Sequence, residues 1–446
     1  MGRVRRGGAR RSRVRPAGAR AVLDAHSRDP PRPRQEDRVT GPTTPTTPVT
    51  PARKRALTAA ADAVRDHGPR LIALSHSLHA EPETALREHK SAAKIALLAE
   101  EAGFEVTRAV AGLPTAFVAA YGTGDLTVAL CAEYDALPGI GHACGHNVNG
   151  AASVGAALGL AAVADLLGIT VKLVGTPAEE DIGGKALLLE AGVFDDVAAA
   201  FMVHAAPEDS VGASSLAVGA WDVVYWGRPA HAALAPWEGV NALDAITLAH
   251  TAVGLLRQQL PPGALVHDVV FEAGLAVNVI PETARARYEL RARTIEDLAH
   301  ARRRVRACLE AAALATGAEL ELTPRGADFA DLRQDAFLTA AYTRAVRALG
   351  REPVDRSGEV MASTDMGNVS HVLPALHPTI GYDTGGARHH TAPFARYGDS
   401  PGADRAVLAA ATALAHVGVE LATDAAQRGR CLDLLAARRA AAAPAP

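Results

Sequence analysis

Apolar residues follow two patterns along the first half of the chain, one typical of helices and one typical of buried strands. The helical pattern spaces Leu and Ala along one face, whereas the strand pattern is a short continuous apolar run. The expected helices are 56–79, 91–103, 150–167 and 184–191, and the expected strands are 115–121, 126–131, 170–174 and 201–204. This alternation of strands and helices predicts a mostly parallel sheet with helices on its faces.

The pattern changes near Val211. Residues 217–323 have the order strand, helix, two strands, helix, strand, which is that of a ferredoxin-like βαββαβ module. Within it, residues 285–292 alternate between apolar side chains on one face and mainly charged side chains on the other, as in a half-exposed strand. After Phe329 the helical and strand signals resume, and they end with an Ala-rich helix near 402–423.

These changes predict an α/β protein in which a larger domain with a mixed, mostly parallel sheet is interrupted by a smaller domain. We expect the segments 55–212 and 326–425 to form the larger domain. Residues 213–325 are expected to form the inserted smaller domain. Residues 1–54, rich in Arg, Pro and Thr, are expected to be a disordered basic extension and linker, and 426–446 a C-terminal tail.

Charge is unevenly distributed, although the net charge of the 446 residues is only −3. The first 55 residues are strongly basic and the remainder is acidic, so we expect no nucleic-acid partner for the body of the chain. The basic start can be read as a nucleic-acid-binding tail. Its near lack of aromatic and β-branched residues favours instead a disordered extension, or a start codon placed too far upstream.

No apolar run follows the paired arginines near the start, so no secretory signal is predicted. The longest apolar stretch, residues 151–169, contains Asp165 and many small residues, which favours a buried helix over a membrane span. The 4 cysteines form no CxxC pair, a pattern that is not typical of a disulfide framework. We therefore expect a cytoplasmic protein with no membrane partner.

Residues 133–147 carry the densest chemical signal, because His142, Cys144 and His146 stand close together among glycines. They follow the expected strand 126–131, and α/β proteins place their sites just past the carboxyl ends of strands. Thiolate and imidazole groups suit zinc and similar divalent ions. For this segment alone, a polar loop with a buried cysteine is the alternative.

Further signals lie at strand ends or in the loops that follow them. The acidic residues 179–181 follow the expected strand 170–174, and adjacent carboxylates can divide the work of binding a metal and taking a proton from its water. The other signals are His204, at the end of an apolar run, and the His389–His390 pair. Each is weak alone, but together they supply sulfur, nitrogen and oxygen donors for two metal ions.

Several segments are more specific than single residues. They are AEYDALPGIGHACGHN at 132–147, SLHAEPE at 77–83, GLAVNVIPE at 274–282 and STDMGNVS at 363–370. With these segments, residues 56–424 resemble the amidohydrolase branch of the aminoacylase/carboxypeptidase metallopeptidase family. That branch includes hippurate hydrolases, auxin-conjugate hydrolases, aminobenzoyl-glutamate hydrolase and a β-alanyl-lysine-type dipeptidase, and the first segment is closest to the last two.

The resemblance implies that the larger domain is the catalytic, metal-binding domain and that the insert at 213–325 is a lid and dimerisation domain. It also implies roles for individual residues. The implied metal ligands are Cys144, placed to bridge, with His146, Glu180, His204 and His390. Glu179 is implied as the general base and Asp135 as a carboxylate that orients a ligand. His231 resembles a histidine that reaches the neighbouring protomer's site and stabilises the oxyanion, and Asn278 resembles a substrate-binding asparagine. The choice of His390 over His389 rests on the resemblance.

We therefore expect an enzyme with two divalent ions, Zn or Mn, that hydrolyses an amide bond in a small N-acyl amino acid, an aminobenzoyl-glutamate-like conjugate or a dipeptide. A metal-bound water is the nucleophile at neutral pH, and Glu179 takes its proton and passes it to the leaving nitrogen. His231 donates to the developing oxyanion. The insert is expected to join a homodimer, because its sheet edges need protection or a partner.

Two alternatives remain open. One is a catalytically inactive metal-binding scaffold, against which the presence of Glu179 argues. The other is a broader metallopeptidase acting on longer peptides, which a lid that closes over the site disfavours. The chain also departs from many of the wider branch at Glu133, where they have Asp. That difference bears on the substrate pocket or on the metal preference.

Overall fold

The computed structural model describes residues 50–442. Its first helix is α1 (Pro51–Asp66), which begins where the Thr50 side chain accepts a hydrogen bond from the backbone amide of Arg53. Pro51 occupies the first turn, where its missing amide hydrogen costs nothing. The extension expected at 1–54 lies outside the described residues except for its last positions, most of which belong to α1.

Helices α2 (Gly68–Ala80) and α3 (His89–Glu101) follow α1. The continuous helix expected at 56–79 is therefore two helices, divided at His67. A proline, Pro69, stands in the first turn of α2. A proline inside a helix lacks the amide donor and clashes with the preceding turn, so one helix does not run through this point.

The main sheet has six strands in the order β1-β2-β4-β3-β5-β15. Neighbours among β4, β3, β5 and β15 pair in parallel, whereas β1 and β2 add antiparallel pairs at one edge. The strands are β1 (Glu105–Arg108), β2 (Phe117–Tyr121), β3 (Leu126–Ala132), β4 (Ile169–Gly175), β5 (Ala199–Phe201) and β15 (Ala375–Leu376). The predicted α/β class with a mixed, mostly parallel sheet is confirmed.

The apolar run at 201–204 is not one strand, contrary to expectation. β5 ends at Phe201, and His204 begins β6 (His204–Ala206) in a second sheet with the order β13-β7-β16-β6. The chain changes sheets because β6 pairs with β16 rather than with β3. The remaining short strands are β7 (Ser210–Val211), β13 (Val354–Asp355), β16 (Thr379–Gly381), β8 (Ser214–Ser215) and β14 (Val360–Met361).

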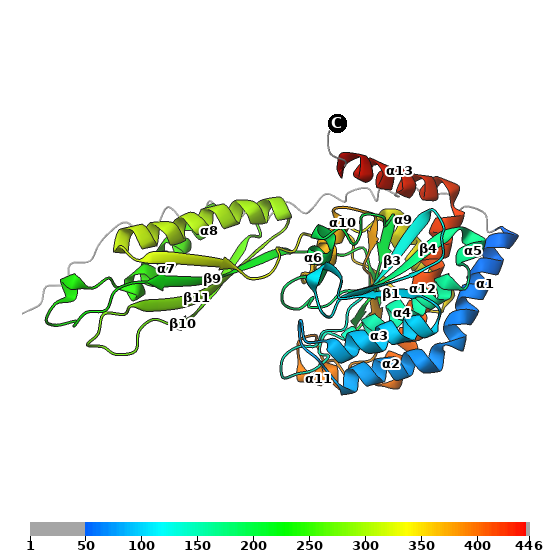
Figure 1. The fold of residues 1–446 in the computed structure, drawn as a ribbon, viewed down its shortest axis with the longest axis horizontal. Helices are drawn as coiled ribbons and strands as arrows, with labels where there is room; N and C mark the ends of the chain where they lie inside the picture. Colours follow the sequence, from blue (N-terminus) through cyan, green and yellow to red (C-terminus); the bar gives the residue numbers. More distant parts are fainter. Residues whose placement is uncertain (1–49, 443–446) are drawn as a thin grey trace, which may run out of the picture. The chain divides into compact units, whose positions relative to one another are not determined.

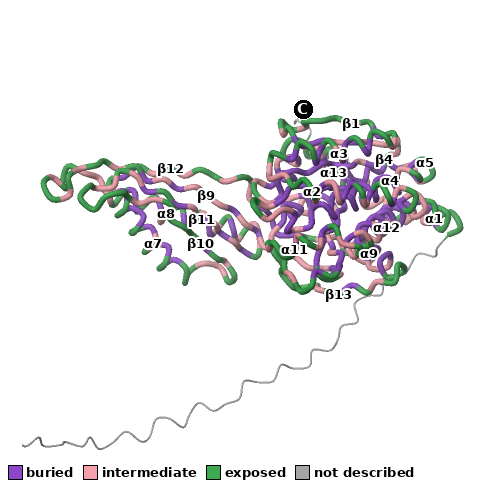
Figure 2. The backbone as a smooth tube through the Cα atoms, turned by 90° about the horizontal axis from the view of Figure 1, so that it is seen from below, coloured by how far each residue is buried: buried purple, intermediate pink, exposed green. Residues whose placement is uncertain are grey.

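Helix α4 (His146–Ala161) is the central helix of the larger domain, and it is buried along all but its last residue (Figure 2). Helices α1, α2 and α12 (Pro401–Thr423) pack around it (Figure 1). Gly155 allows the close approach of α12, because a Cβ there would lie 2.7 Å from the Cβ of Ala411. Among the described residues, α12 is the one helix long and apolar enough to cross a membrane, and 72% of its most apolar window is buried inside the protein.

Helices α6 (Gly184–Glu190) and α10 (Met366–Ser370) contribute to a second core on the opposite face of the sheet. The remaining helices contribute to the main core and are α5 (Ala164–Leu167), α9 (Ala336–Ala348), α11 (Ala392–Ala395) and α13 (Ala425–Ala442). Where the sequence suggested a tail at 426–446, residues 425–442 form helix α13. Its Cys431 and Leu435 are buried and belong to the main core.

The insert, residues Ala217–Pro324, has the expected βαββαβ order and its own hydrophobic core. Its antiparallel sheet has the order β10-β11-β9-β12, and α7 and α8 cover one face (Figure 1). The elements are β9 (Ala217–Trp226), α7 (Ala242–Leu256), β10 (Leu265–Glu272), β11 (Thr283–Ala292), α8 (Ile295–Thr316) and β12 (Glu319–Pro324). Along β11 the apolar side chains face the helices, which leaves the opposite, charged face uncovered by them.

Candidate metal centre

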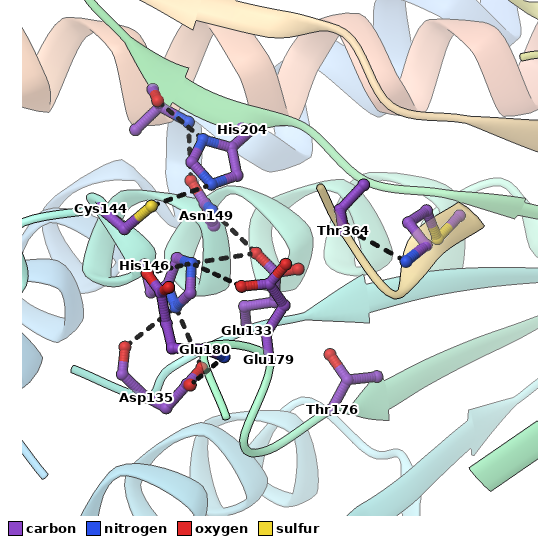
Figure 3. Close-up of polar contacts among 12 residues, drawn as sticks. Glu133, Asp135, Cys144, His146, Asn149, Thr176, Glu179, Glu180, His204 and Thr364 are labelled. Atoms are coloured by element: carbon purple, nitrogen blue, oxygen red, sulfur yellow. Dashed lines mark hydrogen bonds and ion pairs between the residues drawn. The ribbon is translucent and has the colours of Figure 1, made fainter. Parts of the chain in front are cut away.

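The loop after β3 and the start of α4 place the first metal-site residues. Gly145 precedes α4 with φ 80°, a left-handed conformation that favours glycine. A Cβ at Gly145 would lie 2.5 Å from the Cβ of Ala205, so only glycine lets this turn approach β6. The turn thereby brings Cys144 and His146 next to His204 at the start of β6 (Figure 3).

The implied ligands form two groups that share Cys144. In the first, the Cys144 sulfur lies 3.5 Å from Nε2 of His204, and His146 completes the set. In the second, the same sulfur lies 3.6 Å from Nε2 of His390, which is 3.4 Å from Oε2 of Glu180. Within each group the ligand atoms lie within 4.8 Å of one another, as side chains around one ion do. A thiolate common to both groups suits a bridging ligand between two ions.

The donor atoms fit divalent ions. Nε2 of His146 and Oε1 of Glu180 are buried, and within the described structure they have no hydrogen-bond partner. Buried polar atoms without partners are costly unless something else binds them. The other ring nitrogens are engaged: Nδ1 of His146 lies 3.0 Å from Asp135 Oδ1, and Nδ1 of His204 lies 2.8 Å from the Ala205 carbonyl. Both rings therefore direct Nε2 into the site, as metal-binding histidines do.

The implied ligands differ in their protonation preferences. Although burial acts in the opposite direction, the charges of Glu133 and Asp135 raise the pKa of His146 well above its usual value, so this ring has to lose a proton before it binds a metal. Burial lowers the pKa of His204 to about 3, which keeps this ring in the neutral form that binds metals. Burial, with the charge of Glu180, raises the pKa of the Cys144 thiol well above its usual value. A thiol in such surroundings is expected to lose its proton only together with the arrival of a cation.

Glu179 and Glu180 lie on a turn that follows β4. Ala178, just before them, has φ 59°, an unusual conformation for a residue with a Cβ. Asp135 accepts a hydrogen bond of 2.9 Å from the Glu180 amide, so one carboxylate orients both His146 and this turn. Glu179 is buried, and burial together with the neighbouring charges of Glu133 and Glu180 raises its pKa well above the usual value.

A buried ion-pair network behind the ligands was missed by the sequence reasoning. Nζ of Lys185 lies 2.5 Å from Glu133 and 2.7 Å from Asp365, and all three side chains are fully buried. Glu133 also accepts from Asn149, whose side-chain oxygen accepts from the Ala205 amide beside His204. The available signal was the single lysine in the otherwise largely apolar start of α6, since a buried lysine needs a carboxylate partner.

A cavity of about 450 Å³ is lined by four of the five implied ligands and in part by the insert. Arg287, Glu289 and Arg291, on the uncovered face of β11, line it. Arg291 donates to Glu289 at 2.9 Å and to Ser363 of the catalytic domain at 3.0 Å. The alternating pattern of β11 had located these charged side chains on one face, but that face was interpreted as solvent-exposed.

His231 and Asn278 lie together in the insert, away from the other predicted site residues. The Asn278 carbonyl accepts from the Ala232 amide at 3.0 Å, and both side chains are on exposed residues. Neither residue lines the cavity in this single chain. The structure thus gathers seven of the predicted residues, including Asp135 and Glu179, and leaves these two outside.

The two adjacent histidines point in different directions. His390 has φ 60° and directs Nε2 toward Cys144 and Glu180. His389 instead lies with Nε2 2.8 Å from the Ala205 carbonyl. His377, which the sequence reasoning did not select, also lines the cavity, and burial lowers its pKa to about 4.

This fold and cluster of donors define a metal-dependent hydrolase of amide bonds. The model of peptidase family M20/M25/M40 matches residues 129–416, and the chain belongs to this family. The resemblance to aminoacylase-like metallopeptidases is confirmed. One solved structure with this fold is a dinuclear metal-binding peptidase of the M20 family from Bacillus subtilis, with a TM-score of 0.61 and 24% identity over 80% of this chain and 99% of that chain.

Relatives with related activities match over long segments. The Xaa-Arg dipeptidase of Mus musculus is 37% identical over 381 residues, which are 81% of this chain and 88% of the relative. One of the p-aminobenzoyl-glutamate hydrolase subunits of Escherichia coli (strain K12) is 35% identical over 283 residues, which are 58% of each chain. The aminobenzoyl-glutamate utilization protein of Klebsiella pneumoniae has the same fold, with a TM-score of 0.64 and 21% identity over 80% of this chain and 97% of that chain.

Proposed function

We propose that this enzyme hydrolyses the amide bond of a small dipeptide, N-acyl amino acid or aminobenzoyl-glutamate-like conjugate at a site that holds two divalent ions. The observation that carries the proposal is the pair of donor groups around Cys144, with Glu179 beside them and a cationic insert face in the same cavity. The names of the mouse and Escherichia coli relatives support a small substrate of this class.

Two bound ions would supply a water that is nucleophilic at neutral pH and would polarise the scissile carbonyl. Cys144, His146, Glu180, His204 and His390 would hold them. Glu179 has no ligand role in either group around Cys144, and it is close enough to both to take a proton from the attacking water. It then passes that proton to the leaving nitrogen. Asp135 keeps His146 and the Glu180 backbone in place throughout.

The substrate's free carboxylate binds Arg291 in this proposal. Arg291 lines the cavity with a guanidinium that reaches from the insert to Ser363 of the catalytic domain. Its planar donor fork matches carboxylate geometry. The cavity volume of about 450 Å³ suits a dipeptide-sized substrate better than a long peptide. This argues against a broad peptidase.

A second copy of the chain completes the site. His231 and Asn278 stand outside the cavity of their own chain, and exposed apolar side chains surround them in sequence. These are Leu234, Trp237, Leu275 and Val277. An exposed apolar group of this kind favours a protein interface, and a homodimer would deliver His231 to the oxyanion and Asn278 to the substrate of the other subunit.

The metals and the location are parts of the same proposal. The thiolate favours zinc, whereas the carboxylate also accepts manganese, so either ion suits the site. The described cysteines are all free, which agrees with a reducing cytoplasm.

The test is a hydrolysis screen across Xaa-Arg dipeptides, β-alanyl dipeptides, N-acyl amino acids and aminobenzoyl-glutamate, with elemental analysis of the same preparation. We expect two equivalents of Zn or Mn per chain and turnover in at least one substrate class. A protein that holds two ions and hydrolyses none of them would support the scaffold alternative. Activity mainly on long peptides would support the broader peptidase.

A further inference from the structure

Glu88 is a buried carboxylate that the chemistry described above does not use. It stands at the start of α3, and its exposed fraction is 0%. Among the described residues it forms no ion pair with a basic side chain; its partners are the Thr115 hydroxyl and the Ala178 amide, each at 2.9 Å. Burial away from any cation is unfavourable for the charged form of this carboxyl group, so its two hydrogen bonds are the interactions that compensate its burial.

Glu88 is not needed to cap α3. That task belongs to Glu83, which accepts hydrogen bonds from the Ser91 amide and hydroxyl, both at 2.8 Å, and from the Lys90 amide at 3.2 Å. The Glu88 side chain makes no capping bond. It points instead to a turn that is 90 positions away in the sequence.

That turn carries the base and a ligand. Ala178 is fully buried, and its left-handed backbone is an uncommon conformation for a residue other than glycine. Its amide donates to Glu88, and the next amide but one, that of Glu180, donates to Asp135. On another side the turn is crowded by α6, because a Cβ at Gly184 would collide with the carbonyl of Pro177. Two carboxylates thus hold alternate amides on either side of Glu179.

We propose that Glu88 is a positioning residue, which holds the Ala178 amide so that Glu179 and Glu180 are presented to the metal site from one fixed turn. The proposal rests on the proposed function for its catalytic consequence. Its structural part concerns the turn alone and stands independently. A small displacement of a base has a large effect on rate, since misplacement by about 1 Å can cost on the order of 100-fold.

The test compares Glu88→Asp with Glu88→Gln. Asp keeps the charge but withdraws the carboxylate by one methylene, so it no longer reaches the Ala178 amide. Gln removes the charge but keeps an oxygen for Ala178 and an NH₂ group for the Thr115 hydroxyl. Thr115→Val is a matched control, because it removes the other partner of Glu88 and leaves the Ala178 bond.

The first readout is amide hydrogen exchange of the peptide spanning 176–183 in metal-free protein, which requires no activity. We expect faster exchange in Glu88→Asp, and exchange close to that of the unsubstituted chain in Glu88→Gln and Thr115→Val. Unchanged exchange in a folded Glu88→Asp chain would overturn the proposal. If Asp prevents folding, Glu88→Leu takes its place, because it removes both hydrogen bonds without burying a charge; unchanged exchange in that chain would overturn the proposal.

The second readout is steady-state kinetics on the best substrate of the screen, together with metal content. We expect Glu88→Asp to lower kcat about 10-fold to 100-fold with KM changed less than 3-fold and both ions retained. Gln should restore most of kcat. Faster exchange combined with an unchanged kcat would overturn the catalytic part. If the unsubstituted chain hydrolyses nothing, the proposed function fails, whereas the exchange data still decide whether Glu88 holds the turn.

Discussion

The implied metal ligands come together within one chain, whereas the two predicted site residues of the insert lie outside the cavity of their own chain. The catalytic domain holds its implied ligands in buried or half-buried positions, except for the exposed His390. A carboxylate fixes the ring of His146 and a carbonyl fixes that of His204, and a lysine lies between two carboxylates behind them. The insert presents His231 and Asn278 on exposed positions among exposed apolar side chains. One region is preorganised by its own fold, whereas the other, in the function proposed above, acts on a neighbouring chain.

This difference separates two kinds of functional residue. Metal ligands must converge within a few ångströms and lose their protons, so burial and fixed partners are needed before the ion arrives. Substrate and oxyanion contacts are needed only when substrate is bound, so they can be supplied by a mobile domain or a second subunit. Variants in the two regions should therefore differ in metal content, in subunit dependence and in KM.

The largest effect is expected at the base. Glu179→Gln should keep both ions and lower kcat by about 10²-fold to 10⁴-fold, because a general base contributes on that order. Glu180→Gln should instead lose metal, since Glu180 lies in the donor group with Cys144 and His390. Elemental analysis beside kinetics separates the two. A Glu179→Gln chain that turns over at close to the parent rate would show that another group is the base.

The next effect concerns the insert. His231→Ala should lower kcat by about 10²-fold to 10³-fold, as the loss of one oxyanion donor does, while metal content stays unchanged. Mixing His231→Ala chains with Glu179→Gln chains should restore activity after subunit exchange, because one site of a mixed dimer then has both groups intact. Subunit exchange demonstrated by mass, with no gain in activity, would place His231 outside the partner's site.

A third effect is a pH dependence of stability in the catalytic domain. Burial, with the charge of Asp135, raises the pKa of Glu88 to about 7 from an ordinary value of 4.5; Tyr134, whose pKa burial also raises, lies near it. The folded state therefore holds a proton that the unfolded chain has already lost, and stability falls as pH rises from about 4.5 to 7. Glu88→Gln removes this loss.

Denaturant unfolding of metal-free protein at pH 5 and pH 8 measures the effect. The free energy of unfolding of Glu88→Gln, relative to the parent chain, should rise by about 2–3 kcal/mol between these pH values. Thr115→Val is the control, since it keeps the carboxyl group. An equal pH dependence in Glu88→Gln and the parent chain would mean that Glu88 titrates normally.

The residues implied as metal ligands come together in the structure because they occupy short segments at strand ends. The Cys-Gly-His and Glu-Glu segments each place two functional groups side by side, and topology then brings the segments together. The strand ending at His204 was mispredicted in its extent, because pairing of β6 with β16 depends on residues far along the chain. Local pattern carries no information on such pairing.

The residues that sequence reasoning missed act through distant partners. Lys185 pairs with Asp365 across 180 positions, and Glu88 holds Ala178 across 90. In a sequence, a lone lysine in an apolar helix and a glutamate near a helix start are usually interpreted as solvent-exposed residues. Only burial in the folded chain distinguishes these residues from surface charges. Arg291 was assigned to the correct face of β11, but the cavity that this face lines depends on two domains.

The smallest predicted effect concerns Arg291, which connects the insert to the catalytic domain through its hydrogen bond to Ser363. Arg291→Ala should raise KM about 10-fold to 100-fold with a smaller change in kcat, because a charge-assisted hydrogen bond to a carboxylate contributes about 1.5–3 kcal/mol. Arg287→Ala is the matched control on the same face. Each arginine pairs with a carboxylate of the insert, Arg287 with Asp222 and Arg291 with Glu289, but Arg291 also reaches Ser363 of the catalytic domain. A substrate whose carboxylate is amidated should bind weakly to the parent chain and lose little further affinity in Arg291→Ala. An Arg291→Ala chain with unchanged KM for both substrates would place the carboxylate elsewhere, and the insert would then contribute through the second subunit alone.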